Sequence, residues 1–489
     1  MDLKRLGTET LSTFFCRCAY GVFLLLILLI GWQTLSHEST LLDQVLWGLG
    51  CAVVAAGLLW AAGELAGRLD WKVTLAGLLL LCLALRLFWV LHAQIQPMGD
   101  YSVFHGVAST MAESYDLWAN QYLSLFPHVM GYSWFLSLFY KVLGPSPLAA
   151  AVINALLSTL SCALLFLLAK RLWGEKAAAM AGLVWTFFPS QILYNMFVLS
   201  EPLYTTLILG FLLAAVRFDA GAKAPSCKGA AGWGALAGAL AAAVDLCRPV
   251  GAILLLCLLL WLGPVRLDGW KERTFRRNAL CFLLALIGMY LLAGRLGGGY
   301  LDRRLGVPSA TTPGYNILVG FNAQSGGMWN PEDSALLFET AAEPGATPDS
   351  TQLKMLDYAK ARVTSGAIDF GKLFGDKLYN LMGRDDACVV YAASVLARSQ
   401  ALAKLCNIYW YMALLLALAG GVAACVKRDR SGLFPAMLYF VGLILAHMLV
   451  EVAGRYHYSL LVPLCLMATQ GVIGLGELAA RRKPQKQSV

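Results

Sequence analysis

Long apolar segments recur along the whole chain, and they limit its possible folds more than any other feature. Most of them extend over about 20 residues, which is the length that a helix needs to cross a bilayer, and the segment 249–263 is shorter. Candidate spans lie at 17–35, 41–62, 72–93, 148–169, 176–195, 201–217, 229–246, 249–263, 278–294, 406–426, 432–451 and 456–478. The pattern predicts an all-α polytopic membrane protein with about twelve transmembrane helices.

Composition and charge support a membrane protein and argue against a nucleic-acid partner. Of the 489 residues, 59% are hydrophobic and 14% are charged, whereas soluble domains carry about a quarter charged residues. The net charge of +9 comes from short basic clusters between apolar segments. Such clusters are typical of cytoplasmic membrane loops, so we expect no nucleic-acid binding.

The segment 128–144 decides the topology. If it crossed the membrane, the basic clusters that follow it would lie outside, against the positive-inside rule. If it lies on the outer surface, they all lie inside together with both termini. These clusters are at 169–176, 217–228, 265–277, 427–430 and 481–486. The segment is short and rich in aromatic residues, which favours an interfacial helix.

This topology predicts two large loops on the outer face. Residues 1–71 form an accessory two-helix hairpin, and 72–294 form a transmembrane core with the first outer loop at 94–147. The second outer loop is expected at 295–405, and 406–489 supply the last spans and a basic cytoplasmic tail. Within the second loop, Asp349 or Ser350 can cap a helix that ends near Gly366.

The thirteen cysteines show neither metal-ligand nor disulfide spacing. Most of them, Cys281 among them, lie in apolar segments, where cysteine acts as a small hydrophobic residue. A disulfide between Cys388 and Cys406 is the one pairing that the loop positions allow.

Several motifs follow one another in an order that is similar to a known family. They are "MGDYSVFHGVASTMAE" (98–113), "FPHVMGYSWFLSLFYKVLG" (126–144), the segment 169–204, "CRPVG" (247–251), "GYNILVGFNAQSGGMWNPED" (314–333) and "GRYHYSLLVPL" (454–464). The chain resembles the GT-C superfamily of membrane glycosyltransferases over about 72–480. The resemblance is closest to bacterial relatives of the dolichyl-phosphate-mannose protein mannosyltransferases and to the aminoarabinose transferases.

The resemblance implies a reaction and its partners. A sugar on a polyprenyl-phosphate donor is transferred with inversion, at the outer face of the membrane, to a glycan, lipid or protein acceptor. No cofactor is expected, because one early aspartate without an adjacent acid favours a metal-free mechanism; a divalent metal ion, which several relatives need, stays an alternative. A transporter or flippase and a ligase of lipid-linked saccharides are the alternative functions. A transporter more often has inverted repeats and midplane charges; we find no repeat, and the interiors of the predicted spans are nearly free of acids.

Asp100 is the candidate general base, because it stands just after a span at the outer face. A positioned carboxylate can take the proton of an attacking hydroxyl, and an apolar surrounding would raise its pKa toward that task. The alternative is a solvated loop acid. Tyr101 and His105 follow at near-helical spacing and are candidates for orienting the base or the sugar.

A phosphate leaving group needs cationic partners. Arg248 and Arg455 stand at the outer ends of spans, where the positive-inside bias disfavours arginine. Each is expected to bind the donor phosphate or to pair with Glu201 or Glu451, with Tyr456 as a neighbour of Arg455. His128 is a further candidate ligand of the phosphate or sugar.

The second outer loop carries residues that suit sugar contacts. Asn322, Gln324 and Asn330 offer amide hydrogen bonds, and Trp329 offers an aromatic face. The alternative is a turn that packs a tryptophan. The nearby sequence "RDDA" (384–387) is expected to be a solvated turn.

Overall fold

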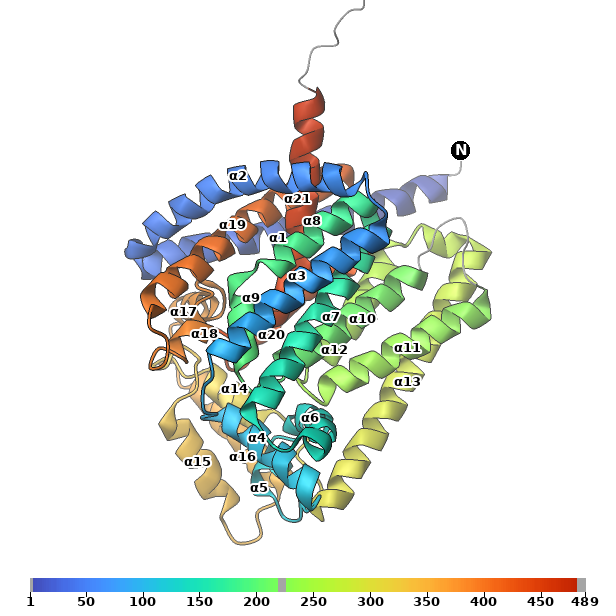
Figure 1. The fold of residues 1–489 in the computed structure, drawn as a ribbon. Coiled ribbons are helices and arrows are strands. Elements are labelled where there is room, and N and C mark those ends of the chain that lie inside the picture. The colour runs from blue at the N-terminus through green and yellow to red at the C-terminus, as the bar shows by residue number, and fades with distance from the viewer. Residues whose placement is uncertain (1–2, 219–225, 482–489) are drawn as a thin grey trace, which may run out of the picture.

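A computed structural model describes residues 3–218 and 226–481, which fold into helices joined by loops (Figure 1). Nine helices of this described part are long and apolar enough to cross a membrane. They are α1 (Leu3–His37), α2 (Leu42–Ala66), α3 (Trp71–His92), α7 (Pro147–Trp173), α10 (Glu201–Phe218), α11 (Cys227–Asp245), α13 (Arg273–Leu305), α19 (Ser399–Lys427) and α21 (Leu461–Arg481). The predicted all-α polytopic fold is confirmed.

Three further apolar segments complete the twelve that the sequence predicts. One is a bent pair, in which α8 (Glu175–Thr186) meets α9 (Pro189–Leu193) and the turn Tyr194–Met196 at 61°. The other two are the shorter helices α12 (Gly251–Leu260), which continues into Trp261–Val265, and α20 (Leu433–Leu449).

The bend in the α8–α9 segment has a clear cause. Pro189 starts α9, and the residue before a proline is pushed out of the helical conformation, as the extended backbone of Phe188 shows. Arg86, fully buried on α3, donates to the carbonyls of Trp185 and Thr186 at 3.2 and 3.3 Å. Carbonyls at the end of α8 that the bend leaves without helical partners are thereby paired.

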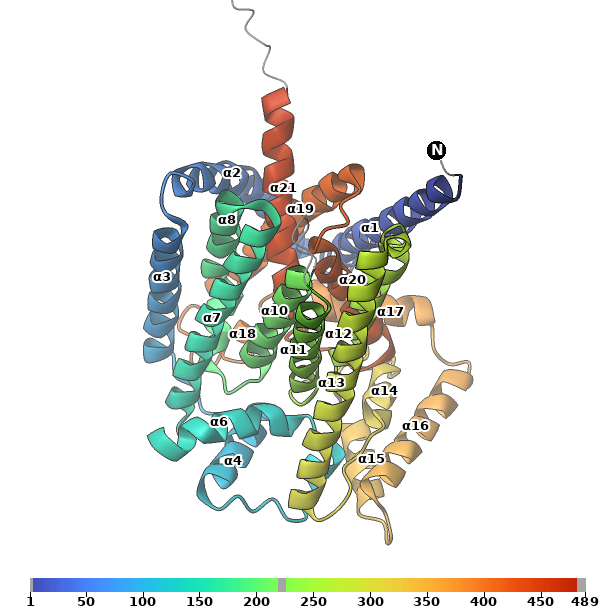
Figure 2. The same cartoon turned by 90° about the vertical axis from the view of Figure 1, so that its right-hand side faces the viewer.

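The first loop contains α4 (Asp100–Glu113), α5 (Gln121–Leu125) and α6 (Val129–Leu143). In Figure 2, α6 lies crosswise to the neighbouring spans α7 and α13. It buries Tyr132 completely and leaves Val142 83% exposed. This amphipathic, crosswise helix agrees with the interfacial placement that the sequence predicts for 128–144.

The second loop holds α14 (Gly314–Gly320), α15 (Pro331–Ala341), α16 (Pro348–Thr364), α17 (Phe370–Met382) and α18 (Ala387–Val390). The cap of α16 is Thr347 rather than Asp349 or Ser350, and Ser350 returns a hydrogen bond to Thr347 in a capping box. The flanking spans are longer than predicted, because α13 continues to Leu305 and α19 begins at Ser399.

The short helices of both loops gather at one end of the bundle (Figures 1 and 2). The start of α1 and the end of α21 lie at the opposite end. Most of the predicted basic tail and part of the basic segment 217–228 lie outside the described residues.

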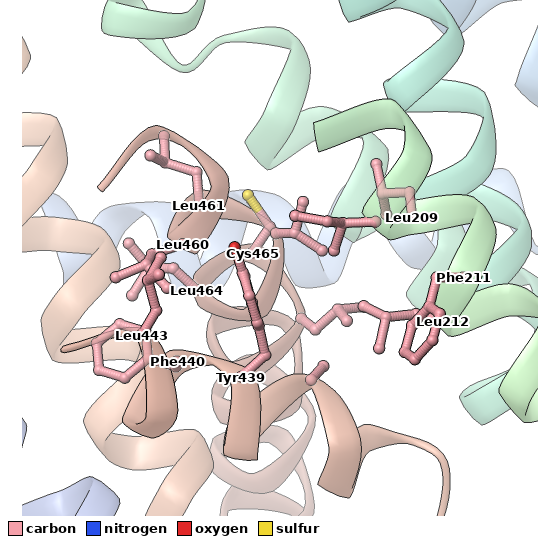
Figure 3. Close-up of a cluster of buried hydrophobic side chains, with 14 of the residues drawn as sticks. Leu209, Phe211, Leu212, Tyr439, Phe440, Leu443, Leu460, Leu461, Leu464 and Cys465 are labelled. Carbon is pink, nitrogen blue, oxygen red and sulfur yellow. The ribbon is translucent and has the colours of Figure 1, made fainter. Parts of the chain in front are cut away.

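A buried apolar cluster fixes the helices that carry the polar residues of the loop end. Figure 3 shows side chains of α10, α20, α21 and the turn Tyr458–Leu460 packed together, with Leu209, Tyr439 and Leu464 among them. All three are fully buried. The first residue of α10 and the segment that precedes α21 are therefore attached to one rigid core.

Helices α11 and α13 approach each other closely over two glycines spaced four residues apart. A Cβ at Gly234 would lie 2.2 Å from the carbonyl oxygen of Phe282, and one at Gly238 would lie 2.2 Å from that of Leu286. Small residues at this spacing allow close contact between membrane helices. A disulfide between Cys227 and Cys281 joins the same two helices.

This disulfide corrects the sequence interpretation of the cysteines. The two residues lie 54 positions apart, and only the packing of α11 on α13 brings them together. Cys388 and Cys406, the pairing that the loop positions allowed, are both buried and free.

We predict that Gly234→Val destabilises the protein and that Gly232→Val has a small effect. Gly232 lies on the same helix, and a Cβ there would meet nothing within 4 Å. Overpacking a tight contact costs about 1–3 kcal/mol, so thermal unfolding in detergent should occur at a clearly lower temperature for Gly234→Val. Equal midpoints for the two variants would contradict the close packing of α11 on α13.

Candidate active site

An ion pair joins the two residues that the sequence proposes as base and phosphate ligand. Arg455, in the segment between α20 and α21, donates through Nη2 to Oδ2 of Asp100 at the start of α4. The side chain of Arg455 is 10% exposed and that of Asp100 is 46% exposed. Residues 355 positions apart thus meet at the loop end of the bundle.

Glu201 lies between the two arginines. As the first residue of α10 it is fully buried, and its Oε1 accepts a hydrogen bond of 2.8 Å from Nη2 of Arg248. The same oxygen lies 3.9 Å from Nε of Arg455. The carboxylate balances part of the charge of both guanidinium groups, which could not be buried beside each other without it.

Aromatic faces also hold the arginines. The guanidinium carbon of Arg248 lies 4.6 Å from the ring centroid of Tyr456, and that of Arg455 lies 5.5 Å from it. Arg455 also lies 5.3 Å from the ring centroid of Tyr101. These cation–π contacts fix the direction of both groups without using their N–H donors. Within the described residues, Nε of each arginine has no hydrogen-bond partner.

The pKa of Asp100 departs from expectation. Burial alone would raise it, but the charge of Arg455, the hydrogen bond from Arg455 and the charge of Arg248 outweigh burial, so the pKa lies below its ordinary value. The sequence interpretation of a raised pKa is wrong, because it did not include a direct arginine partner. The ionised form of Asp100 is therefore favoured, and this is the form that a proton acceptor needs.

These groups line a cavity of about 740 Å³. Its polar lining consists of Gln96, Asp100, Tyr101, Tyr122, His128, Arg248, Tyr315, Asn316, Ser334, Tyr391, Ser394, Glu451, Arg455 and Tyr456. A second cavity of about 420 Å³ adjoins it between α11, α13 and the segment before α14, and shares Phe126, His128 and Asn316. The site therefore offers two adjoining spaces.

The two histidines lie in different surroundings. His128 lines both cavities. Burial, with a smaller contribution from Arg248, lowers its pKa to about 4, so its ring is neutral near pH 7 and can act as a hydrogen-bond donor or acceptor. His105 is bonded to the hydroxyl of Tyr140 at 2.8 Å and does not line either cavity.

Of the four candidate sugar contacts in the second loop, only Trp329 lines the cavity. Asn322 and Asn330 donate to Asp333 at 3.0 and 2.9 Å, and Asp333 pairs with Arg362. They fix the loop in place. Gln324 is exposed and lies away from the cavity lining.

The segment 384–387 is not a solvated turn. Asp385 is fully buried and its Oδ1 lies 2.9 Å from Nε2 of His457, which is equally buried. Trp410 stacks on this histidine with ring centroids 4.7 Å apart. Because His457 stands two residues after Arg455, the pair anchors the arginine segment to the end of the second loop.

Sequence reasoning named neither Asn316 nor Ser334 and considered Glu451 only as an ion-pair partner. Glu451 instead accepts a hydrogen bond of 3.1 Å from the hydroxyl of Tyr456. An acid beside the motif "GRYHY" at the end of a span was the available signal. As to metal ions, no group of three or more His, Cys, Asp or Glu side chains in residues 3–218 and 226–481 is placed to hold one.

Fold and site define a polytopic membrane protein with a polar cavity beneath its loop helices. Residues 127–297, from the start of α6 into α13, match the family model of the dolichyl-phosphate-mannose-protein mannosyltransferases. This match, over part of the chain, supports the resemblance to the GT-C superfamily of membrane glycosyltransferases that the sequence motifs indicate.

Solved structures with a similar course of the chain are distant in sequence. ArnT from Cupriavidus metallidurans, bound to undecaprenyl phosphate, is 15% identical with a TM-score of 0.34, over 84% of this chain and 79% of that one. The archaeal oligosaccharyltransferase AglB from Archaeoglobus fulgidus, in complex with an inhibitory peptide and a dolichol-phosphate, is 12% identical with a TM-score of 0.40, over 85% and 51%. No curated protein matches the chain by sequence.

We predict that Glu201→Gln destabilises the protein strongly. Removing one partner of a buried ion pair costs about 3–5 kcal/mol, and here two arginines would lose their shared carboxylate. The matched control is Glu64→Gln, which removes an exposed ion pair with Lys176 and should cost at most about 1 kcal/mol. Thermal unfolding in detergent measures both, and equal midpoints would contradict the role of Glu201.

Proposed function

We propose that the chain transfers a hexose or pentose from a polyprenyl-phosphate donor to an acceptor hydroxyl or amine, with inversion, at the outer face of the membrane. The observation that carries the proposal is the arrangement of Asp100, Arg455 and Arg248 along one cavity, with the buried Glu201 beside both arginines. The matched family, whose members are described as dolichyl-phosphate-mannose-protein mannosyltransferases, supports the donor class.

Arg455 and Arg248 are the proposed ligands of the donor phosphate. Both line the cavity, and a guanidinium group carries five N–H donors, of which the recorded bonds to Glu201 and Asp100 use one Nη2 on each arginine. As the bond between the anomeric carbon and the phosphate oxygen breaks, its electron pair leaves with the phosphate. Cationic donors fixed in advance stabilise that developing charge.

Asp100 is the proposed proton acceptor. The acceptor oxygen forms a bond to the anomeric carbon on the face opposite the phosphate, and its proton passes to the carboxylate. When a phosphate binds Arg455, the arginine shares its charge between two anions. Asp100 then loses part of what lowers its pKa, so it becomes a stronger base when the donor is bound.

The outer-face assignment rests on the distribution of charge. Lys170 and Arg171 end α7, Arg217 is in the last turn of α10, and Arg273 begins α13. All belong to helix ends away from the loop helices, and the positive-inside rule assigns such ends to the cytoplasm. The two adjoining cavities offer separate spaces for the donor and the acceptor.

We predict that Asp100→Asn lowers the release of polyprenyl phosphate from a radiolabelled polyprenyl-phosphate sugar by at least about 100-fold, the usual contribution of a general base. Purified full-length protein in lipid nanodiscs is the sample. Glu113→Gln is the matched control, because Glu113 is an exposed acid at the other end of α4.

Two outcomes would contradict the proposal. Full activity of a folded Asp100→Asn variant would remove the base from the mechanism. Movement of intact donor across the bilayer by the wild type, without cleavage of the phosphate–sugar bond, would favour a transporter instead of a glycosyltransferase.

A further inference from the structure

One part of the cavity carries polar and aromatic groups that the proposed transfer does not use. It is formed by α14, the start of α15 and the segment between α20 and α21, and it contains Asn316, Trp329 and Glu451. None of them contacts the two arginines through a hydrogen bond or ion pair that the structure records. This region of the cavity combines an amide, a carboxyl group and an aromatic ring, whereas the region around Arg455 is lined by arginines and Asp100.

The backbone of Glu451 is clamped to the second loop. Its N–H donates to the carbonyl of Asn316 at 2.8 Å, and the next N–H, of Val452, donates to Gly327 at 2.9 Å. The ammonium of Lys377 binds the carbonyls of Val450 and Met448 at 2.8 and 2.9 Å. These bonds fix the backbone from which the Glu451 side chain extends at the cavity wall, and a ligand contact requires such a fixed position.

One oxygen of the Glu451 carboxyl group accepts a hydrogen bond from the protein, and the other can bind a ligand. Its Oε1 accepts the hydrogen bond from the Tyr456 hydroxyl, and this is the one side-chain hydrogen bond that the described residues provide for it. Burial raises the pKa of Glu451, while the Tyr456 hydrogen bond and the charges of Arg455 and Arg248 oppose the rise without cancelling it. The neutral form, which carries an O–H donor, is favoured relative to an ordinary glutamate.

The neighbouring groups match this chemistry. Asn316 lines both cavities, and its amide offers donors and an acceptor. Trp329 is 58% exposed although it is one of the largest apolar side chains, and its ring lines the cavity. A carboxyl group, an amide and an open aromatic face complement hydroxyl groups on the edge of a ring and C–H groups on its face.

We propose that Glu451 and Asn316 bind the hydroxyl groups of a neutral pyranose ring and that Trp329 covers one face of that ring. The inference rests on the proposed function, which requires a sugar in this cavity, and adds the class of sugar and the residues that select it. Hydroxyl groups can pair with either form of the Glu451 carboxyl group, whereas a cationic amino sugar would require the carboxylate.

The test measures binding of methyl α-mannopyranoside, methyl α-glucopyranoside and methyl 2-amino-2-deoxyglucopyranoside to the full-length protein by saturation-transfer NMR. Glu451→Ala and Asn316→Ala should weaken binding of a neutral glycoside by about tenfold, the effect of one lost hydrogen bond to a buried group. Glu451→Gln keeps a donor and an acceptor and should bind within about twofold of the wild type by the same comparison. Glu332→Gln, an exposed acid on α15, is the control.

Each outcome has one meaning. Unchanged binding in Glu451→Ala would overturn the proposal. The proposal would also be overturned if the wild type bound the amino sugar more tightly than the neutral glycosides and Glu451→Gln lost this preference. That result would show that a carboxylate at Glu451 recognises a cation. Displacement of the neutral glycoside by polyprenyl-phosphate mannose would identify the bound ring as the donor sugar, and binding beside that donor would identify it as the acceptor; both support the proposal.

This readout separates the inference from the proposed function. Simple glycosides bind whether or not the chain cleaves a lipid-linked donor, so a wild type that binds them through Glu451 without cleaving donor would remove the transferase reaction and keep the sugar site. If the wild type cleaves the donor and Glu451→Ala binds glycosides as the wild type does, the transferase reaction stands and the sugar site at Glu451 is removed.

Discussion

The carboxylate of Glu201 is the interaction on which the rest of the loop end depends. It is completely buried, and one of its oxygens lies 2.8 Å from Arg248 and 3.9 Å from Arg455. Two guanidinium groups at the edge of a membrane would repel each other and lose their hydration, at a cost of several kcal/mol each. Because Glu201 starts α10 and α10 packs on α20 and α21 (Figure 3), this charge is held by the most rigid part of the bundle.

Three segments far apart in the chain converge on this carboxylate. The turn between α11 and α12 supplies Arg248, the segment before α21 supplies Arg455, and α4 adds Asp100 against Arg455. The buried pair of Asp385 and His457 ties the arginine segment to the second loop. Positive charge is thus concentrated beneath the loop helices, where both arginines line the cavity.

Hydrophobic pattern and charge distribution predicted the twelve apolar segments, the crosswise helix α6 and the presence of Asp100, Arg248 and Arg455 at one end of the bundle, because length, amphipathicity and the positive-inside rule are local properties. They did not predict that Asp100 touches Arg455, so the direction of its pKa shift was missed. The disulfide of Cys227 with Cys281, the buried Asp385 and the places of Asn316 and Glu451 were missed for the same reason. Each depends on contacts between distant segments, which periodicity does not encode.

The central claim is that the arginine pair forms a site for a lipid phosphate, and binding of a product-like lipid tests it most directly. The measurement compares the dissociation constants of a polyprenyl phosphate and of the corresponding polyprenol, which has the same chain and no phosphate, for the wild type and Arg455→Gln in nanodiscs. The account predicts that the phosphate strengthens binding by at least about tenfold in the wild type, as charge-assisted contacts do, and much less in the variant. Equal affinity of the wild type for the phosphate and the alcohol would contradict it.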